Sequence, residues 1–243
     1  MKDNIRRCKN IPELMAVWKA APEYDFSAFI EDGIVNPETY EYPHLLFFLR
    51  EKNDNQPCNL CNDLRTRGCN GKTWNNIARW TKALLDDNVE YPLKISAEER
   101  IKQVKRIAVI NLKKEGGGSR VEWDKVEKAV NDQCHEILRE IELCTPSIII
   151  CGGLRNAELL KKYVLNDISS DWKNDIRSES FKSIWPYYYA SINGENIPVI
   201  GFCHPQATNL NGKHGHENLF RPLYQDMLYI RKFFMIKQKM ERI

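Results

Sequence analysis

The chain has 243 residues, of which 42% are hydrophobic and 28% are charged, a balance that is typical of a folded domain with a sizeable core. The formal net charge of +3 neither requires nor excludes a polyanionic partner, because nucleic-acid binding depends on basic residues gathered on one face. No apolar run approaches the length that spans a bilayer, so we expect no membrane anchor.

The N-terminal stretch and the cysteines bear on where the protein resides. Residues 1–10 are polar and basic, and no apolar segment of the kind found in a secretory signal follows them. Of the eight cysteines, Cys151 and Cys203 lie in apolar stretches, where a free thiol behaves as a small hydrophobic side chain. We therefore expect a cytoplasmic protein with reduced thiols.

The N-terminal half begins with a helical extension over residues 1–42, in which the spacing of 11–20 predicts a short amphipathic helix. Residues 44–50, HLLFFLR, form a continuous apolar run, which predicts a strand buried on both faces. Residues 51–72 carry many turn residues and little periodicity, so they are predicted to form a long loop. Helical spacing resumes in residues 73–87.

The middle of the chain repeats this pattern. Ser96 and Glu99 form a capping box that predicts a second helix. The apolar run 106–112 predicts a second buried strand, and the glycine-rich loop 113–120 closes it. Residues 121–143 are predicted to form one long helix, and a proline three residues later prevents that helix from continuing.

The C-terminal part supplies a third buried strand at 147–153, whose final glycine pair opens another helix. Residues 168–186 are polar and irregular, which indicates an insertion. Asn193-Gly194 is a strong two-residue signal for a β-hairpin. Residues 217–243 are predicted to form a terminal helix with an aromatic face.

Because strands alternate with helices, we expect one domain over residues 1–243 with a three-layer α/β/α architecture and a central, mostly parallel, four-stranded sheet. Ligands of such sheets bind beyond the carboxyl ends of the strands. Four segments follow predicted strands, namely 51–54, 111–118, 152–153 and 204–210. Their polar groups are therefore expected to converge on one rim.

Three of these segments carry groups suited to catalysis or to reading a base. Glu51, Asn53 and Asp54 directly follow the first strand, where a carboxylate can act as a base or stabilise a cation, or can simply cap the strand. Asn111 has both a donor and an acceptor, which suits the edge of a nucleobase, although it can equally satisfy loose backbone groups. His204 follows the last strand, where a proton donor is useful.

The glycines and the last loop suggest backbone contacts. Gly152-Gly153 matches neither a dinucleotide fingerprint nor a P-loop, so it is either an approach to phosphate or a tight turn. The polar residues after His204 can bind phosphate oxygens, and Leu210 is an apolar side chain that can wedge into a base stack. An ordinary polar turn is the alternative for this loop.

In order and spacing, these segments resemble the motifs of the uracil-DNA glycosylase superfamily. FFLREKND stands where that family has its first strand and water-activating loop, and VINLKKEGGGSR resembles the strand with the base-reading asparagine. IIICGG is similar to the strand before a phosphate-contacting turn. FCHPQA resembles the His-Pro-Ser motif, and TWNNIARW falls where the family has a helix. The resemblance covers residues 43–211.

The chain also departs from this family. The first motif is Arg50-Glu51-Lys52-Asn53, whereas the family has a glycine and a proline there, and Gln206 replaces the usual serine. Much of the remaining sequence, including 168–186, has no counterpart. These departures point away from uracil and toward another altered base. The superfamily includes members that act on bulky phage-type modified cytosines.

The resemblance implies a monofunctional DNA glycosylase that flips a modified or damaged pyrimidine out of DNA, hydrolyses its N-glycosidic bond and leaves an abasic site. We expect a monomer that acts on duplex or single-stranded DNA and needs no metal or cofactor. The expected catalytic residues are Glu51, Asn53, Asp54 and His204; the expected base-binding residues are Asn111, Phe48 and Trp74; and the expected DNA contacts are Lys113, Gly152, Gly153, Pro205, Gln206, Leu210, Lys213 and His214.

Three other functions stay open at this point. One is repair of uracil in DNA by the same chemistry. Another is a metal-dependent hydrolase, with three ligands from Cys58, Cys61 and Cys69 and two more from His214 and His216, although a strong zinc signature needs a second cysteine pair. The third is a DNA-binding module that lacks catalysis.

Overall fold

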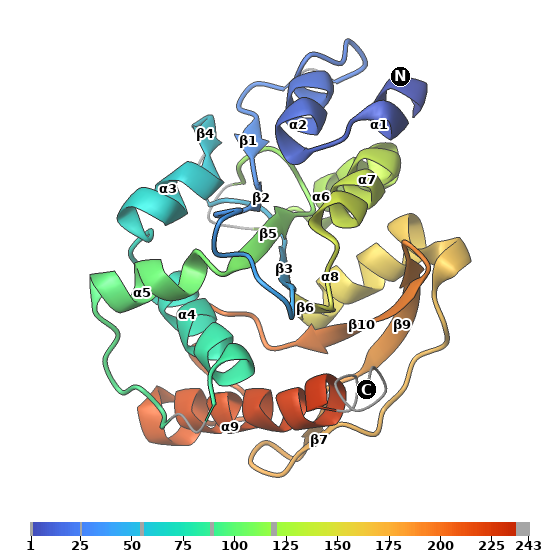
Figure 1. Cartoon of the computed structure of the whole chain (residues 1–243). Coiled ribbons are helices and arrows are strands. Elements are labelled where there is room, and N and C mark those ends of the chain that lie inside the picture. The colour runs from blue at the N-terminus through green and yellow to red at the C-terminus, as the bar shows by residue number, and fades with distance from the viewer. Residues whose placement is uncertain (1, 25, 54–55, 88–89, 118–120, 237–243) are drawn as a thin grey trace.

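The structure is a computed structural model (Figure 1). It describes residues 2–24, 26–53, 56–87, 90–117 and 121–236. Asp54, expected to be catalytic, and residues 118–120 of the glycine-rich loop lie outside the described residues.

The architecture is mixed α/β, with a mostly parallel central sheet between two layers of helices (Figure 1). The sheet has six strands, so the expected number of four is wrong. In spatial order the strands are β2 (Gly33–Ile34), β5 (Ile107–Asn111), β3 (Leu45–Leu49), β6 (Ile148–Gly152), β10 (Glu195–Phe202) and β9 (Tyr187–Ile192).

The four central strands are parallel, and the two additional strands are antiparallel edges. β2 pairs with β5, and β9 pairs with β10. The two residues of β2 are too few to produce a recognisable apolar run. Every residue of β3, β5 and β6 is buried, which explains why these strands are continuously apolar instead of alternating.

Helices cover both faces of the sheet. One face packs against α3 (Leu60–Arg67), α4 (Lys72–Leu85), α5 (Ala97–Val104) and α9 (Arg221–Ile230). The other packs against α1 (Lys2–Arg7), α2 (Ile11–Lys19), α6 (Trp123–Asp132), α7 (Cys134–Cys144) and α8 (Leu154–Leu159). Shorter helical turns extend α8 and α9, namely η1 (Leu160–Val164), η2 (Asn166–Ile168), η3 (His216–Phe220) and η4 (Arg231–Ile236).

Two predicted local signals are confirmed. The Ser96 hydroxyl accepts a hydrogen bond from the Glu99 amide at 3.1 Å, so it caps α5 as expected. Asn193 and Gly194 have φ angles of 52° and 80° and join β9 to β10. Positive φ at both positions is what a tight hairpin turn requires.

Two predicted elements are wrong. Residues 121–143 form two helices, because Gln133 leaves the helical region with φ −110° and ψ 19°; the preceding Asn131 and Asp132 are weak helix formers. The predicted loop 51–72 contains α3 and also β4 (Cys58–Asn59), which pairs with β1 (Ile30–Glu31). Asn59 caps the start of α3 and Gly68 ends it in the left-handed conformation.

The segments outside the predicted core lie against the sheet. Residues 1–42 contribute two helices and also the edge strand β2. Within 168–186, Ser169 and Lys173 bridge to the outer strand β9, and the segment then forms the small hairpin of β7 (Arg177–Ser178) and β8 (Ser183–Ile184). The predicted terminal helix is present through residue 236.

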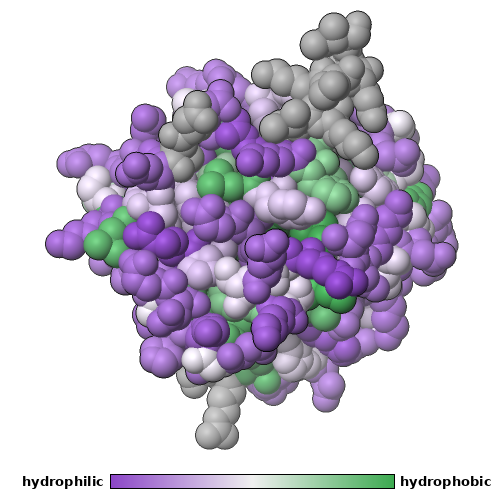
Figure 2. Space-filling model, turned by 90° about the horizontal axis from the view of Figure 1, so that it is seen from below, coloured by the Kyte–Doolittle hydropathy of each residue, from purple (hydrophilic) through white to green (hydrophobic). Residues whose placement is uncertain are grey.

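The outer surface is largely hydrophilic on the face shown in Figure 2, where apolar side chains form small, separate patches. Within the part of the chain that the structure describes, no helix is both long and apolar enough to cross a bilayer.

Candidate functional site

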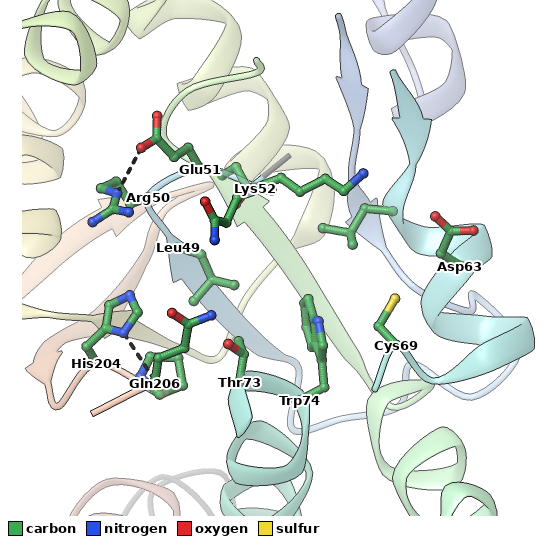
Figure 3. A pocket seen from close by; sticks show the side chains of 14 residues that line it. Leu49, Arg50, Glu51, Lys52, Asp63, Cys69, Thr73, Trp74, His204 and Gln206 are labelled. Carbon is green, nitrogen blue, oxygen red and sulfur yellow. Dashed lines mark hydrogen bonds and ion pairs between the residues drawn. The ribbon is translucent and has the colours of Figure 1, made fainter. Parts of the chain in front are cut away.

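A cavity of about 260 Å³ lies beyond the carboxyl ends of the parallel strands. The sheet register aligns the ends of its strands, because Leu49 pairs with Asn111. Both of these side chains line the cavity, and His204 reaches it from the loop after β10. Figure 3 shows His204 and Trp74 on opposite sides of the cavity, with Thr73 between them. Three of the four predicted loops therefore meet here.

His204 is held in one orientation and in one protonation state. Its Nδ1 accepts a hydrogen bond from the backbone amide of Gln206 at 3.1 Å, so the neutral ring carries its hydrogen on Nε2. Burial and, second, the positive charge of Arg50 lower the pKa of His204. At neutral pH the ring is therefore an uncharged donor.

The His204 loop is fastened to α4 by two buried polar residues that the sequence analysis did not predict. Asn76 donates through Nδ2 to the Pro205 carbonyl at 2.8 Å, and Arg79 donates to Asn76 Oδ1 at 3.0 Å. Arg79 also donates to the carbonyls of Pro92 and Leu93. The sequence feature that could have indicated these residues is their spacing, because Asn76 and Arg79 lie three residues apart beside the apolar face of this helix.

Glu51 lines the cavity, but its carboxylate is engaged elsewhere. Its side chain is 4% exposed, and it pairs with Arg50 Nε at 3.2 Å and with Lys113 Nζ at 3.4 Å. In Figure 3 the carboxylate turns toward Arg50 and away from Trp74. Glu51 therefore holds the side chains of Arg50 and Lys113, and its carboxylate is not directed at the open part of the cavity.

Gly117 closes over the Glu51 carboxylate. A Cβ atom at this position would lie 2.2 Å from Glu51 Cδ, well inside contact distance. The Gly117 amide donates to the Lys52 carbonyl at 2.7 Å and so fixes the loop in place. The glycine-rich loop therefore has a steric role at the site that its composition alone did not specify.

Asn111 is anchored by Asp32, another residue that the sequence analysis missed. The backbone amide and the Nδ2 of Asn111 donate to the same oxygen of Asp32, at 2.8 and 2.9 Å. Asp32 also pairs with Lys114. No strand was predicted around residue 32, so the sequence carried no signal that placed this carboxylate beside Asn111.

The far end of the cavity comes from the segment predicted as a loop. Asp63 of α3, Thr73 and Trp74 of α4, and Lys52 and Cys69 line it. Figure 3 shows the Lys52 side chain extending toward Asp63 and Cys69. Burial raises the pKa of Cys69 to about 11, so this thiol is uncharged at neutral pH. This end combines an aromatic ring with charged and hydroxyl groups.

Among the expected site residues, Asn53, Trp74, Pro205 and Gln206 line the cavity with those described above. Others do not. Phe48 is fully buried in the core on the opposite face of the sheet, because neighbouring strand residues point to opposite faces. Lys113 is occupied by Glu51 and by the Gly116 carbonyl, at 3.0 Å from the latter.

The contacts of the Gly152-Gly153 turn within the structure are packing contacts and backbone hydrogen bonds. A Cβ at Gly152 would lie 3.0 Å from side-chain atoms of both Leu49 and Pro205, so the glycine lets the end of β3 and the His204 loop pack closely against it. The Gly153 amide donates to the carbonyls of Cys151 and Phe202, both at 2.9 Å. Gly153 itself has a φ of 117°, which favours glycine.

The distal part of the last loop lies apart from the cavity lining. Leu210, the expected wedge, is partly buried against the core, and its backbone bonds to that of Lys213. Lys213 and His214 are exposed. His216 Nδ1 lies 2.7 Å from the Tyr91 hydroxyl, so the two histidines have separate surroundings.

All eight cysteines fall among the described residues, and each is a free thiol. Within the described ranges, no three histidine, cysteine, aspartate or glutamate side chains are gathered closely enough to hold a metal ion.

No protein-family model matches the chain, and no curated protein matches it either.

Proposed function

We propose that the protein is a DNA glycosylase that takes a flipped, modified or damaged pyrimidine into the cavity and hydrolyses its N-glycosidic bond. The observation that supports this most directly is the pairing of His204 with Asn111 at one cavity. Both line it, and His204 presents a neutral Nε2–H because the Gln206 amide occupies its Nδ1.

The chemistry requires stabilisation of charge on both fragments. As the bond breaks, negative charge grows on the departing base and positive charge on the sugar. A fixed hydrogen-bond donor that meets the base where its charge develops lowers this barrier. His204 supplies such a donor without carrying charge of its own, since burial and Arg50 lower its pKa.

The acidic loop contributes in two ways under this proposal. Glu51 holds Arg50 beside His204 through the 3.2 Å ion pair, so it acts as a positioning residue. Asn53 also lines the cavity. We propose that it helps to orient the attacking water, a function for which the family resemblance leaves Glu51 and Asp54 open.

The size and lining of the cavity favour a modified base over unmodified uracil. Beyond Asn111 and His204 the cavity continues to Lys52, Asp63 and Trp74. A polar substituent on the base can bind these charged groups, whereas an unsubstituted base offers them no such partner. We therefore propose a pyrimidine with a polar substituent, such as a phage-type modified cytosine, which would place the protein in defence against foreign DNA.

The base must leave the duplex before it can enter, which costs about a few kcal/mol. We propose that the loop from Pro205 to His214 grips the DNA backbone during this step. We further propose that the protein acts as a monomer. We also propose that it resides in the cytoplasm, and the free thiols support this location alone.

The test is a panel of duplexes, each with one modified pyrimidine, together with DNA from phages that carry modified cytosine. Incubation with the protein should produce alkali-labile sites at the modified position in at least one substrate. Uracil-containing duplex distinguishes uracil repair from the proposed specificity. If the protein binds these substrates but forms no abasic site on any, it is a DNA-binding module and the proposal is wrong.

A further inference from the structure

The amide of Asn111 is held by a buried charged group. Its Nδ2 and its backbone amide donate to Asp32 Oδ2 at 2.9 and 2.8 Å. The other oxygen of Asp32 accepts a hydrogen bond from Lys114. Asp32 and Asn111 are each 2% exposed, and Lys114 is fully buried, so water does not compete for these contacts.

This arrangement prevents the Asn111 amide from flipping. A carboxylate paired with an ammonium group offers only acceptors. Rotating the amide by half a turn would replace the Nδ2 donor with Oδ1 and set two acceptors against each other. Hydrogen bonds to an ionised partner are roughly twice as strong as neutral ones, so Asp32 strongly favours the orientation with Nδ2 toward it.

Asp32 and the cavity lie on opposite sides of Asn111. Asp32 directly precedes β2, which is the neighbour of β5 at the edge of the sheet. β3 is the neighbour of β5 on the other side, and Leu49 at its end lines the cavity with Asn111. Asp32 therefore determines which end of the amide is presented to a bound base.

Pyrimidines with a 4-oxo group and those with a 4-amino group need opposite arrangements of hydrogen-bond donor and acceptor from such an amide. A 4-oxo pyrimidine places an acceptor next to the N3–H donor, whereas a 4-amino pyrimidine places a donor next to the N3 acceptor. A carboxamide that cannot flip matches one pattern and opposes the other with like groups. We infer that Asp32 is a specificity-determining residue, which acts through Asn111 to distinguish 4-oxo from 4-amino pyrimidines. This inference rests on the proposed glycosylase function.

The same cluster provides a matched control. Glu140 lies 2.6 Å from the Lys114 ammonium, and burial together with the charge of Asp32 raises the pKa of Glu140 well above its usual range. The raised pKa favours the protonated, uncharged form of Glu140. Glutamine has the same shape and is also neutral, so Glu140→Gln should leave the contact between Asp32 and Asn111 intact.

The experiment compares duplexes that differ only at position 4 of the target base. Suitable pairs are uracil with cytosine and the two 5-hydroxymethyl counterparts. The ratio of kcat/KM within a pair is expected to be about tenfold or more for the wild type and to fall toward one in Asp32→Asn, because asparagine can face Asn111 with either a donor or an acceptor. Glu140→Gln should keep the wild-type ratio. An Asp32→Asn protein with the wild-type ratio overturns the inference, and so does a wild type that does not discriminate.

Asp32→Asn leaves the Lys114 ammonium with a weaker partner and can prevent folding. In that case the double variant Asp32→Asn/Lys114→Met, which removes the cation as well, takes its place with the same expected ratio. Failure of both variants to fold, while Glu140→Gln folds, assigns the cluster to stability and overturns the specificity role.

A measurement without substrate separates the two proposals. The side-chain amide of Asn111, identified by NMR from the signal that Asn111→Ala removes, should exchange slowly in the wild type and in Glu140→Gln and faster in Asp32→Asn. Unchanged exchange in Asp32→Asn contradicts the Asp32 contact even if bases are released. No release from any duplex overturns the proposed function and the specificity role with it, while slow exchange that depends on Asp32 would still establish the contact.

Discussion

Asn76→Leu tests whether the contact between α4 and the His204 loop supports the site. Leucine keeps nearly the same branched shape and removes both side-chain hydrogen bonds, the 2.8 Å bond to the Pro205 carbonyl and the 3.0 Å bond from Arg79. Asn76 is 3% exposed, so water does not replace these partners. A buried acceptor left without a donor costs about 1 to 3 kcal/mol, and Arg79 loses one bond while it keeps two others.

We therefore expect the free energy of unfolding to fall by about 2 to 5 kcal/mol in Asn76→Leu. Base release at saturating substrate should fall more than tenfold, because the loop that orients His204 loses its attachment. Urea unfolding and single-turnover release measure the two effects. Thr81→Val is the matched control, since Thr81 is buried in the same helix and its hydroxyl donates to the Ile77 carbonyl of that helix. Wild-type stability and activity in Asn76→Leu would refute the reasoning.

Three further predictions follow from the geometry of the site and the core. Gly117→Ala places a Cβ 2.2 to 2.5 Å from the carboxylate of Glu51, so it should displace this side chain and lower base release about as much as Glu51→Gln does; equal activity to wild type would contradict this role of the loop. The pKa of His204 is lowered by burial and then by Arg50, so activity should decline with falling pH only below the ordinary histidine range near pH 6.5. The Arg50→Gln variant should move this decline to higher pH. A decline at the same pH in both proteins would exclude the effect of Arg50. Burial raises the pKa of Asp226 to about 6, so the protonated group stabilises the fold below about pH 4, and this contribution is lost as the pH rises through about 6. Thermal unfolding of Asp226→Asn should therefore show a weaker loss of stability between about pH 4 and about pH 6 than that of the wild type. Identical profiles of stability against pH in the two proteins would be evidence against the shift.

The central strands could be predicted from sequence because each is buried on both faces. Continuous apolar runs at residues 44–50, 106–112 and 147–153 indicated β3, β5 and β6 without ambiguity. The edge strand β2 has two residues and depends on pairing with β5, so only tertiary structure reveals it. Local propensity similarly could not show that α3 forms between the turn residues of 51–72, since its capping by Asn59 is visible only once the chain is folded.

The site residues divide in the same way. Asn111 and His204 were predictable because Asn111 ends a buried strand and His204 follows one, and parallel strands bring such positions to one edge. The residues that hold them, Asp32 and Asn76, come from elements distant in sequence. Phe48 was expected beside the base, but the alternation of side chains along β3 directs it into the opposite core. A partner's position in space does not follow from spacing along the chain.

The most direct test of the proposed function is mass-spectrometric detection of the free base. Duplexes with a modified pyrimidine would be incubated with the wild type and with His204→Ala, whose loss of the neutral donor should spare DNA binding. The account predicts that the wild type releases the intact modified base and produces an equal amount of abasic DNA. Release by His204→Ala should be at least a hundredfold slower, because loss of one such donor lowers the rate by about 10²–10³-fold. Release at the same rate by both proteins, or no free base from any substrate, would contradict it.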